Sequence, residues 1–458
     1  MKKTVEMNIE SADPVFRSLC ADAAARMKPA QVPGFSFAIY HKGREHYAGL
    51  GVTSIDNPLP VTADTLFQIG SISKTFLATI VLMLVEKGKL KLDVPVRRYL
   101  PGLKLKDEAV ARRVTLRHLL THAGGWDGDL LPDHGRGEDA LRRTIENLHG
   151  LQQLAPLGKF WSYNNSGFYI AGRVIELIYG KPYETVVKEM LFDPLGMQKS
   201  FFFAEDVARH RFVVGHEVMH KKLKVAPKWD IGRGSYPAGG IVCSARDLMR
   251  YARFQLDGCR LPGGKRLLSE KTVKEFHTEI MPSTGFQGIA LSWFTSRPSG
   301  AYFISHGGTT NGQQATLRIC REKKYAVLGL TNSERGKMVF NPVLTRALEE
   351  YLGIKAVAPK LMKNPVSVKE YLGVYTHPLV NYSVSEGQNG LKVDHTLTDP
   401  KERKLYGQQP AIIYRFYEKD KLVAVDAINK GSFGEFLRDE KGRVRWLRLF
   451  LRVLPKKS

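Results

Sequence analysis

One serine and one lysine, separated by two residues, are the first pair in this sequence whose types and spacing could do chemistry. Residues 70–74 read Gly-Ser-Ile-Ser-Lys, and the apolar run 76–85 follows them. That run predicts a buried helix with Ser71 at its N-terminus, where unpaired backbone N–H groups favour an anion. Lys74 lies one turn later, on the same face. A desolvated lysine with a lowered pKa can accept the serine proton, so the pair predicts a nucleophile and its base.

Two later segments carry polar residues that could complete such a site. Tyr163 and Asn165 lie directly before residues 168–178, an apolar stretch that predicts a helix. Residues 302–309 predict an apolar strand that ends in His306, Gly307, Gly308 and Thr309. Taken alone, Ser71 could be a helix cap and the Tyr163 segment a solvated turn. However, S-x-x-K and Y-x-N each occur once in the chain, which favours one shared site.

In this order, the motifs resemble those of the serine β-lactamase superfamily, on its class C, D-Ala-D-Ala carboxypeptidase and esterase side. Members carry S-x-x-K, then Y-x-N, then K-T-G or H-x-G on the strand that lines the site. Further segments typical of the family lie at 92–101, 114–125, 194–197 and 237–248. The resemblance covers about residues 15–350. It implies an α/β (α+β) sandwich: a mainly antiparallel sheet built from both chain ends, including 35–40 and 325–330, flanked by helices, plus an all-helical insert.

The resemblance also implies an acyl-transfer mechanism. Ser71 would attack the substrate carbonyl and carry the acyl group as a covalent intermediate. Lys74 and Tyr163 would share the proton transfers, first from the serine and later from the water that releases the acyl group. The backbone N–H groups of Ser71 and Thr309 would form the oxyanion hole.

The substrate-binding positions indicate which reaction is favoured. By resemblance, Asn165 would hydrogen-bond the acyl-side amide or the Lys74 ammonium, and Gly307 and Gly308 would let the strand approach the substrate closely. His306 stands where lactam-hydrolysing relatives carry a lysine for the substrate carboxylate, and histidine is largely neutral at pH 7. We therefore expect hydrolysis of an ester or amide, of the esterase or D-amino-acid peptidase or amidase type. A β-lactamase or penicillin-binding protein of the same fold is the first alternative.

Two further alternatives come from other functional classes. His216, Glu217 and His220 match H-E-x-x-H, the zinc-peptidase pattern. Gly215 precedes this segment, Pro227 follows it, and alternation would suit a short hairpin better than a zinc-binding helix. A non-catalytic binding scaffold of the same fold is the other alternative, which the intact S-x-x-K and Y-x-N disfavour. The expected enzyme therefore needs no metal or other cofactor.

The composition and charge of the chain indicate which classes of substrate and partner to expect. The 458-residue chain has 69 Lys and Arg against 45 Asp and Glu, a net charge of +24. The basic residues are dispersed and no nucleic-acid motif appears, so we expect a small-molecule or peptide substrate and leave a homo-oligomer open. Four widely spaced cysteines fit a reducing compartment. No run predicts a membrane span, and acidic residues soon follow the basic start of the chain, so the expected location is the cytoplasm.

The pattern of apolar and polar residues along the chain changes near residue 355. We expect a hydrolase domain over 1–355, a linker over 356–365 and a second domain over 366–458. The last region alternates apolar and polar residues in short stretches, which predicts a small antiparallel barrel. Its opening E-Y-x-G-x-Y at 370–375 resembles the lipocalin-like domain of some family members. Because every proposed catalytic residue precedes the linker, a chain ending near Gly353 is expected to keep acylation of Ser71.

Overall fold

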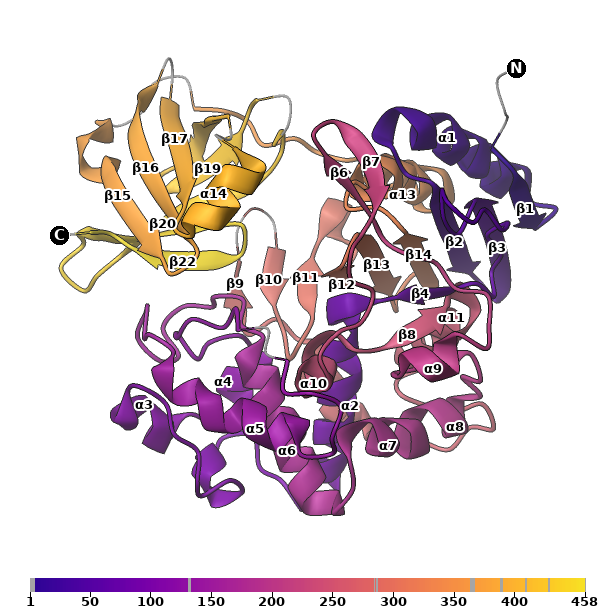
Figure 1. Cartoon of the computed structure of the whole chain (residues 1–458), viewed down its shortest axis with the longest axis horizontal. Helices are drawn as coiled ribbons and strands as arrows, with labels where there is room; N and C mark the ends of the chain where they lie inside the picture. Colours follow the sequence, from indigo (N-terminus) through magenta and orange to yellow (C-terminus); the bar gives the residue numbers. More distant parts are fainter. Residues whose placement is uncertain are drawn as a thin grey trace.

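The computed structural model describes residues 5–130, 133–283, 285, 287–362, 367–387, 390–407, 410–426 and 429–457. The basic start of the chain, residues 1–4, and residues 363–365 of the predicted linker lie outside the described residues. The chain forms a nine-stranded sheet with helices on both faces, a largely helical region, and an eight-stranded sheet from its C-terminal residues (Figure 1).

The nine-stranded sheet is antiparallel and unites the two ends of the hydrolase region. Its strands, in spatial order, are β1 (Met7–Glu10), β3 (Arg44–Gly51), β2 (Gly34–His41), β14 (Tyr325–Thr331), β13 (Gln313–Cys320), β12 (Phe303–Thr310), β11 (Phe294–Ser296), β10 (Gln287–Ile289) and β9 (Met281–Pro282). β2 pairs with β14 along its whole length, which joins residues from both ends of this region. β11 pairs only with the first three residues of β12, so β11 leaves the rest of that edge unpaired. This arrangement confirms the predicted α/β sandwich.

Helices cover both faces of this sheet. On one face, α1 (Pro14–Ala30) and α13 (Lys337–Leu352) pack into an apolar core with β2 and β14. On the other face lie α11 (Ala245–Leu256) and α2 (Ser73–Glu86). Nearly every residue of α2 is buried, as its uninterrupted apolar sequence predicts.

The largely helical region holds the predicted insert and two small sheets. Its helices are α3 (Glu108–Arg113), α4 (Leu116–Leu120), α5 (Ala140–Glu146), α6 (Ser166–Tyr179), α7 (Tyr183–Val187), α8 (Asp193–Leu195), α9 (Ala204–Val207), α10 (Tyr236–Gly239) and α12 (Glu270–His277). The small sheets are β4 (Leu66–Gln68), β8 (Val242–Ser244) and β5 (Ser200–Phe201), and the hairpin β6 (His216–Met219) with β7 (Lys222–Val225). Gly180 ends α6 in the left-handed conformation.

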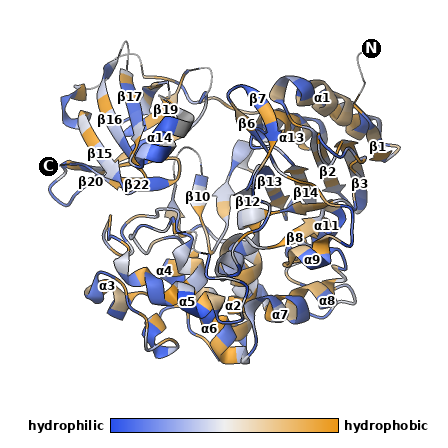
Figure 2. Ribbon diagram, in the orientation of Figure 1, coloured by the Kyte–Doolittle hydropathy of each residue, from blue (hydrophilic) through white to orange (hydrophobic). Residues whose placement is uncertain are grey.

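The C-terminal sheet is an antiparallel meander that closes on itself. Its strands are β15 (Gly373–His377), β16 (Val380–Gly387), β17 (Gly390–Leu397), β18 (Ile412–Glu418), β19 (Lys421–Ala424), β20 (Phe433–Arg438), β21 (Val444–Leu449) and β22 (Arg452–Pro455), with α14 (Pro400–Tyr406) between β17 and β18. A bridge between Tyr375 and Lys456 joins the first and last strands. Hydrophobic and hydrophilic residues alternate along these strands (Figure 2), and the apolar ones form a separate core. The predicted small barrel is confirmed.

The barrel contacts the hydrolase region through the turn between β21 and β22. Leu451, in this turn, packs against an apolar cluster that contains Trp161, Tyr163, Ile289 and Phe294. The Trp446 indole N–H also donates to the Leu154 carbonyl at 2.9 Å. Among the described residues, no helix combines the length and hydrophobicity that crossing a bilayer requires.

Candidate active site

Ser71 and Lys74 lie at the start of α2, where their spacing brings the two side chains together. Ser71 belongs to a single 3-10 turn that continues into the helix. Lys74 Nζ lies 2.9 Å from Ser71 Oγ and donates a hydrogen bond to the Ala238 carbonyl at 2.7 Å. The Lys74 side chain is fully buried. Burial, reinforced by the Arg452 guanidinium, holds the pKa of Lys74 well below its usual range, so its amine can act as a base.

Tyr163 lies on the other side of this pair, in the turn before α6. Its ring centre is 5.0 Å from Lys74 Nζ, and its phenol interacts with the Ser71 side chain. Burial raises the pKa of Tyr163, so the phenol is protonated at neutral pH. The His122 ring stacks on the tyrosine ring at 4.3 Å, and the Tyr163 backbone N–H donates to the Leu451 carbonyl at 2.7 Å. The structure thus brings all three predicted catalytic residues together.

The predicted oxyanion hole depends on close approach between the start of α2 and strand β12. A Cβ on Gly308 would lie 1.9 Å from the Ile69 carbonyl oxygen and 3.1 Å from the Ser71 nitrogen. A Cβ on Gly70, whose φ is +50°, would lie 2.9 Å from the Thr309 nitrogen. Because only glycine fits at both positions, the Ser71 and Thr309 backbone nitrogens are held near one another, as an oxyanion hole requires.

A cavity of about 590 Å³ opens on Ser71 and contains Asn165. Its other lining residues include Tyr169, Trp229, Ile231, Ser235 and Thr309. The Asn165 side-chain amide donates to an Asp129 oxygen at 3.5 Å and forms no hydrogen bond with Lys74 in the described structure. Of its two predicted partners, the substrate amide is therefore the one that this geometry leaves available.

His306 is buried beside the catalytic pair. Its Nδ1 lies 2.6 Å from the Gly307 carbonyl, so Nδ1–H donates and Nε2 keeps its lone pair. Burial, followed by the nearby Lys74 charge, lowers the pKa of His306 to about 3, so the imidazole is neutral at pH 7. Nε2 is buried without a partner among the described residues. This position therefore supplies no cation to the substrate.

Sequence reasoning missed Arg452, which the barrel supplies. Its guanidinium lies 4.8 Å from the Tyr163 ring centre and forms two hydrogen bonds to Asp129, at 2.5 and 2.6 Å. The expectation that a chain ending near Gly353 keeps acylation of Ser71 assumed that no residue after the linker acts on the site, and Arg452 contradicts that assumption. In the sequence, Arg452 is one of seven basic residues after position 440, and nothing distinguishes it from its neighbours.

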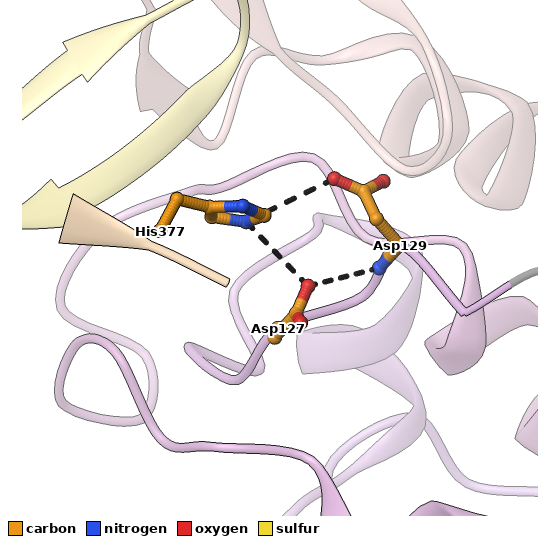
Figure 3. A group of neighbouring side chains, drawn as sticks. All are labelled: Asp127, Asp129 and His377. Carbon is orange, nitrogen blue, oxygen red and sulfur yellow. Dashed lines mark hydrogen bonds and ion pairs between the residues drawn. The ribbon is translucent and has the colours of Figure 1, made fainter. Parts of the chain in front are cut away.

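Asp127, Asp129 and His377 form a second polar cluster where the barrel meets the hydrolase region (Figure 3). His377 Nε2 lies 3.5 Å from an Asp127 oxygen and 3.9 Å from an Asp129 oxygen, a donor set that could hold a metal ion. However, Arg452 already bonds both oxygens of Asp129. The Leu379 N–H donates to His377 Nδ1 at 3.3 Å, which leaves the proton of the neutral imidazole on Nε2. The contacts are those of an ion-pair network that links the two regions.

The zinc-peptidase pattern lies in a hairpin. His216 begins β6, its Nδ1–H donates to the Asn332 carbonyl at 2.7 Å, and its Nε2 accepts the Ile55 N–H at 3.2 Å. Glu217 points to the opposite face of the strand from His216. His220 follows in the turn, with a φ of +49°. With both His216 nitrogens occupied and no helix to align the histidines, this segment lacks the geometry of a zinc-peptidase helix.

Comparisons with known proteins identify the family of this chain. Residues 21–350 match the sequence model of the family described as Beta-lactamase. Penicillin-binding protein 4 of Amycolatopsis lactamdurans is 31% identical over 354 residues, which cover 75% of this chain and 93% of that protein. The crystal structure of SurE matches with a TM-score of 0.77 and 24% identity, over 97% of this chain and 99% of that one. The octameric penicillin-binding protein homologue from Pyrococcus abyssi matches with a TM-score of 0.68 and 23% identity, over 96% and 100%. The chain thus belongs to the beta-lactamase family, and it is a serine hydrolase of that family.

Proposed function

We propose that the protein hydrolyses an ester or amide through an acyl-enzyme on Ser71. The observation that carries this proposal is the 2.9 Å contact between Ser71 Oγ and Lys74 Nζ, with the lysine fully buried and its pKa lowered. A neutral amine in contact with the hydroxyl can accept its proton as the nucleophile attacks.

Lys74 accepts and returns a proton in both acylation and deacylation. As Ser71 Oγ bonds to the substrate carbonyl carbon, its proton passes to Lys74, and the oxyanion forms beside the Ser71 and Thr309 N–H groups. The same proton then moves to the leaving oxygen or nitrogen as that bond breaks. Water next attacks the acyl carbon and gives one proton to Lys74. The bond from that carbon to Ser71 Oγ then breaks, the acid is released, and Lys74 returns the proton to Ser71 Oγ. Tyr163 keeps a protonated phenol beside Ser71 and can relay these protons.

His306 supports an ester or neutral amide over a β-lactam as the preferred substrate. Its imidazole is neutral, so this position supplies no charge for a carboxylate attached close to the scissile bond. A β-lactamase or penicillin-binding activity is the second candidate, and it rests on the names of the relatives, such as Penicillin-binding protein 4. Comparing a p-nitrophenyl ester with nitrocefin separates the two, since we expect the ester to exceed nitrocefin in kcat/KM by orders of magnitude.

Labelling with a fluorophosphonate tests the proposed nucleophile. We expect one label per chain on the Ser71 peptide, and loss of both label and ester turnover in Ser71→Ala. Ser385→Ala, on an exposed barrel strand, is the matched control and should label like the wild type. Equal labelling of Ser71→Ala and wild type would refute the mechanism.

A chelator should leave turnover of the ester unchanged. Loss of turnover that zinc restores would instead support the zinc-peptidase alternative at His216.

A further inference from the structure

A second cavity, of about 260 Å³, lies against β12, the strand that carries His306 and Thr309. Thr309 and Thr310 of β12 line the Ser71 cavity, whereas Ser305, His306 and Gly307 of the same strand line the second one. A substrate whose carbonyl is held at the oxyanion position can therefore extend along β12 from one cavity into the other.

Because Gly307 has no side chain, the space between the two cavities beside this residue is unobstructed. A Cβ at this position would contact only the Ala315 carbonyl oxygen, at 3.5 Å, among the described atoms. Unlike Gly308, which another backbone segment presses against, Gly307 has exposed space above it. Substrate atoms could occupy this space, because no packing requirement explains the absence of a side chain here.

The second cavity contains one cation that lacks a counter-charge. Arg318 lies on β13 opposite Ser305, and its half-buried guanidinium forms no hydrogen bond or ion pair with any residue that the structure describes. Desolvation lowers the pKa of Arg318, but arginine remains charged at neutral pH. None of the described residues that line this cavity is acidic. A partly desolvated cation without an anion is less stable than a paired one, so an anion bound in this cavity would stabilise it.

The rest of the lining suits one small anion. Hydroxyl and amide groups of Ser296, Ser305, Thr316 and Gln287 can donate hydrogen bonds, and Phe294 and Leu451 exclude water from one side. A single guanidinium balances the single charge of a carboxylate and can bind it through two parallel hydrogen bonds. A phosphate would bring a second negative charge that no described lining residue matches.

Strand geometry sets the distance between this cation and the reacting carbonyl. The partner of Arg318, Ser305, is four residues from Thr309, about 13 Å at the rise of an extended strand. We propose, on the basis of the proposed function, that this cavity is a substrate subsite for a carboxylate about 13 Å from the scissile carbonyl, with Arg318 as its counter-charge. The substrate class is then an acidic, extended ester or amide. Its carboxylate lies beyond the group directly attached to the scissile bond.

Two series of esters test this subsite. In one the carboxylate is in the acyl part, in the other it is in the alcohol part, and the spacer ranges from two to ten methylenes; each acid has a matched carboxamide. We expect wild type to prefer the acid over the carboxamide by about 10- to 100-fold in kcat/KM in one series. The maximum should lie near a span of about 13 Å. Arg318→Gln should abolish that preference, and Arg318→Lys should keep part of it.

Controls separate this proposal from the proposed function. Arg44→Gln, which removes an exposed arginine at the start of β3, should keep the full preference. Independently of turnover, decanedioate should raise the Tm of Ser71→Ala but not of Ser71→Ala combined with Arg318→Gln. Absence of fluorophosphonate labelling would refute the proposed function, while this binding test would still decide the subsite. Equal preference in wild type and Arg318→Gln, or no preference at any spacer length, would overturn the subsite.

Discussion

Replacing Arg452 with glutamine should change the pH at which the catalytic base becomes active. Lys74 Nζ and the Arg452 guanidinium lie 5.0 and 4.8 Å from the same Tyr163 ring centre, so the two cations are at most about 10 Å apart. At an effective dielectric constant near 20, two charges at this distance repel by about 1.7 kcal/mol, or about one pKa unit. The substitution removes this repulsion and leaves Asp129, which raises the pKa of Lys74, without its arginine partner.

The sign of the effect follows from the role of the lysine. A base works in its deprotonated form, so activity falls as the pH drops through its pKa. Arg452 lowers the pKa of Lys74, and its loss should therefore move the acidic limb of the pH profile upward, by about one unit. Asp129→Asn should move the limb in the opposite direction, because it removes a charge that raises this pKa.

The assay is kcat/KM for a neutral p-nitrophenyl ester between pH 5 and 9, together with the rate of fluorophosphonate labelling. Arg438→Gln is the matched control, since Arg438 is a barrel arginine with its own acidic partners, Asp420 and Glu370. It should leave the acidic limb unchanged. An unshifted limb in Arg452→Gln, or shifts of the same sign in Arg452→Gln and Asp129→Asn, would refute the electrostatic role of the barrel.

Three further predictions concern the same site. Tyr163→Phe should lower kcat by about 10²–10⁴-fold, because it removes the phenol but keeps the ring that packs on His122; stopped-flow acylation measures this. A chain ending at Gly353, checked for folding by circular dichroism, should acylate Ser71 more slowly than the full chain, and labelling at the wild-type rate would make the barrel dispensable. His306→Lys should improve nitrocefin acylation without gain toward neutral esters, since it adds a cation beside the serine, and an equal gain with both substrates would contradict this reason.

The α/β sandwich was predicted from the family resemblance, whereas individual helices and strands could be predicted because their signals are local. The apolar run after Ser71 is long enough to mark a buried helix, and the structure buries nearly every residue of α2. Alternation in the last hundred residues predicted strands, and these strands form the eight-stranded sheet. The spacing of Ser71 and Lys74 likewise predicted their contact, because residues three apart on a helix share a face. In each case, a period along the chain determines which side chains meet.

The contribution of the barrel had no such local signal. Arg452 lies 323 positions from Asp129 along the chain, and its hydrogen bonds to that residue exist only because the turn between β21 and β22 packs on the Tyr163 segment. Arg318 is a second case: its pairing with Ser305, and a cavity whose described lining holds no acidic residue, emerge only when the whole sheet is assembled. Both arginines change the chemistry of the site through charge, which acts over distance and leaves no pattern in the sequence. In this chain, the motifs identify the nucleophile and its base, whereas Arg452, outside every motif, further lowers the pKa of the buried base, and Arg318 supplies the charge of the proposed subsite.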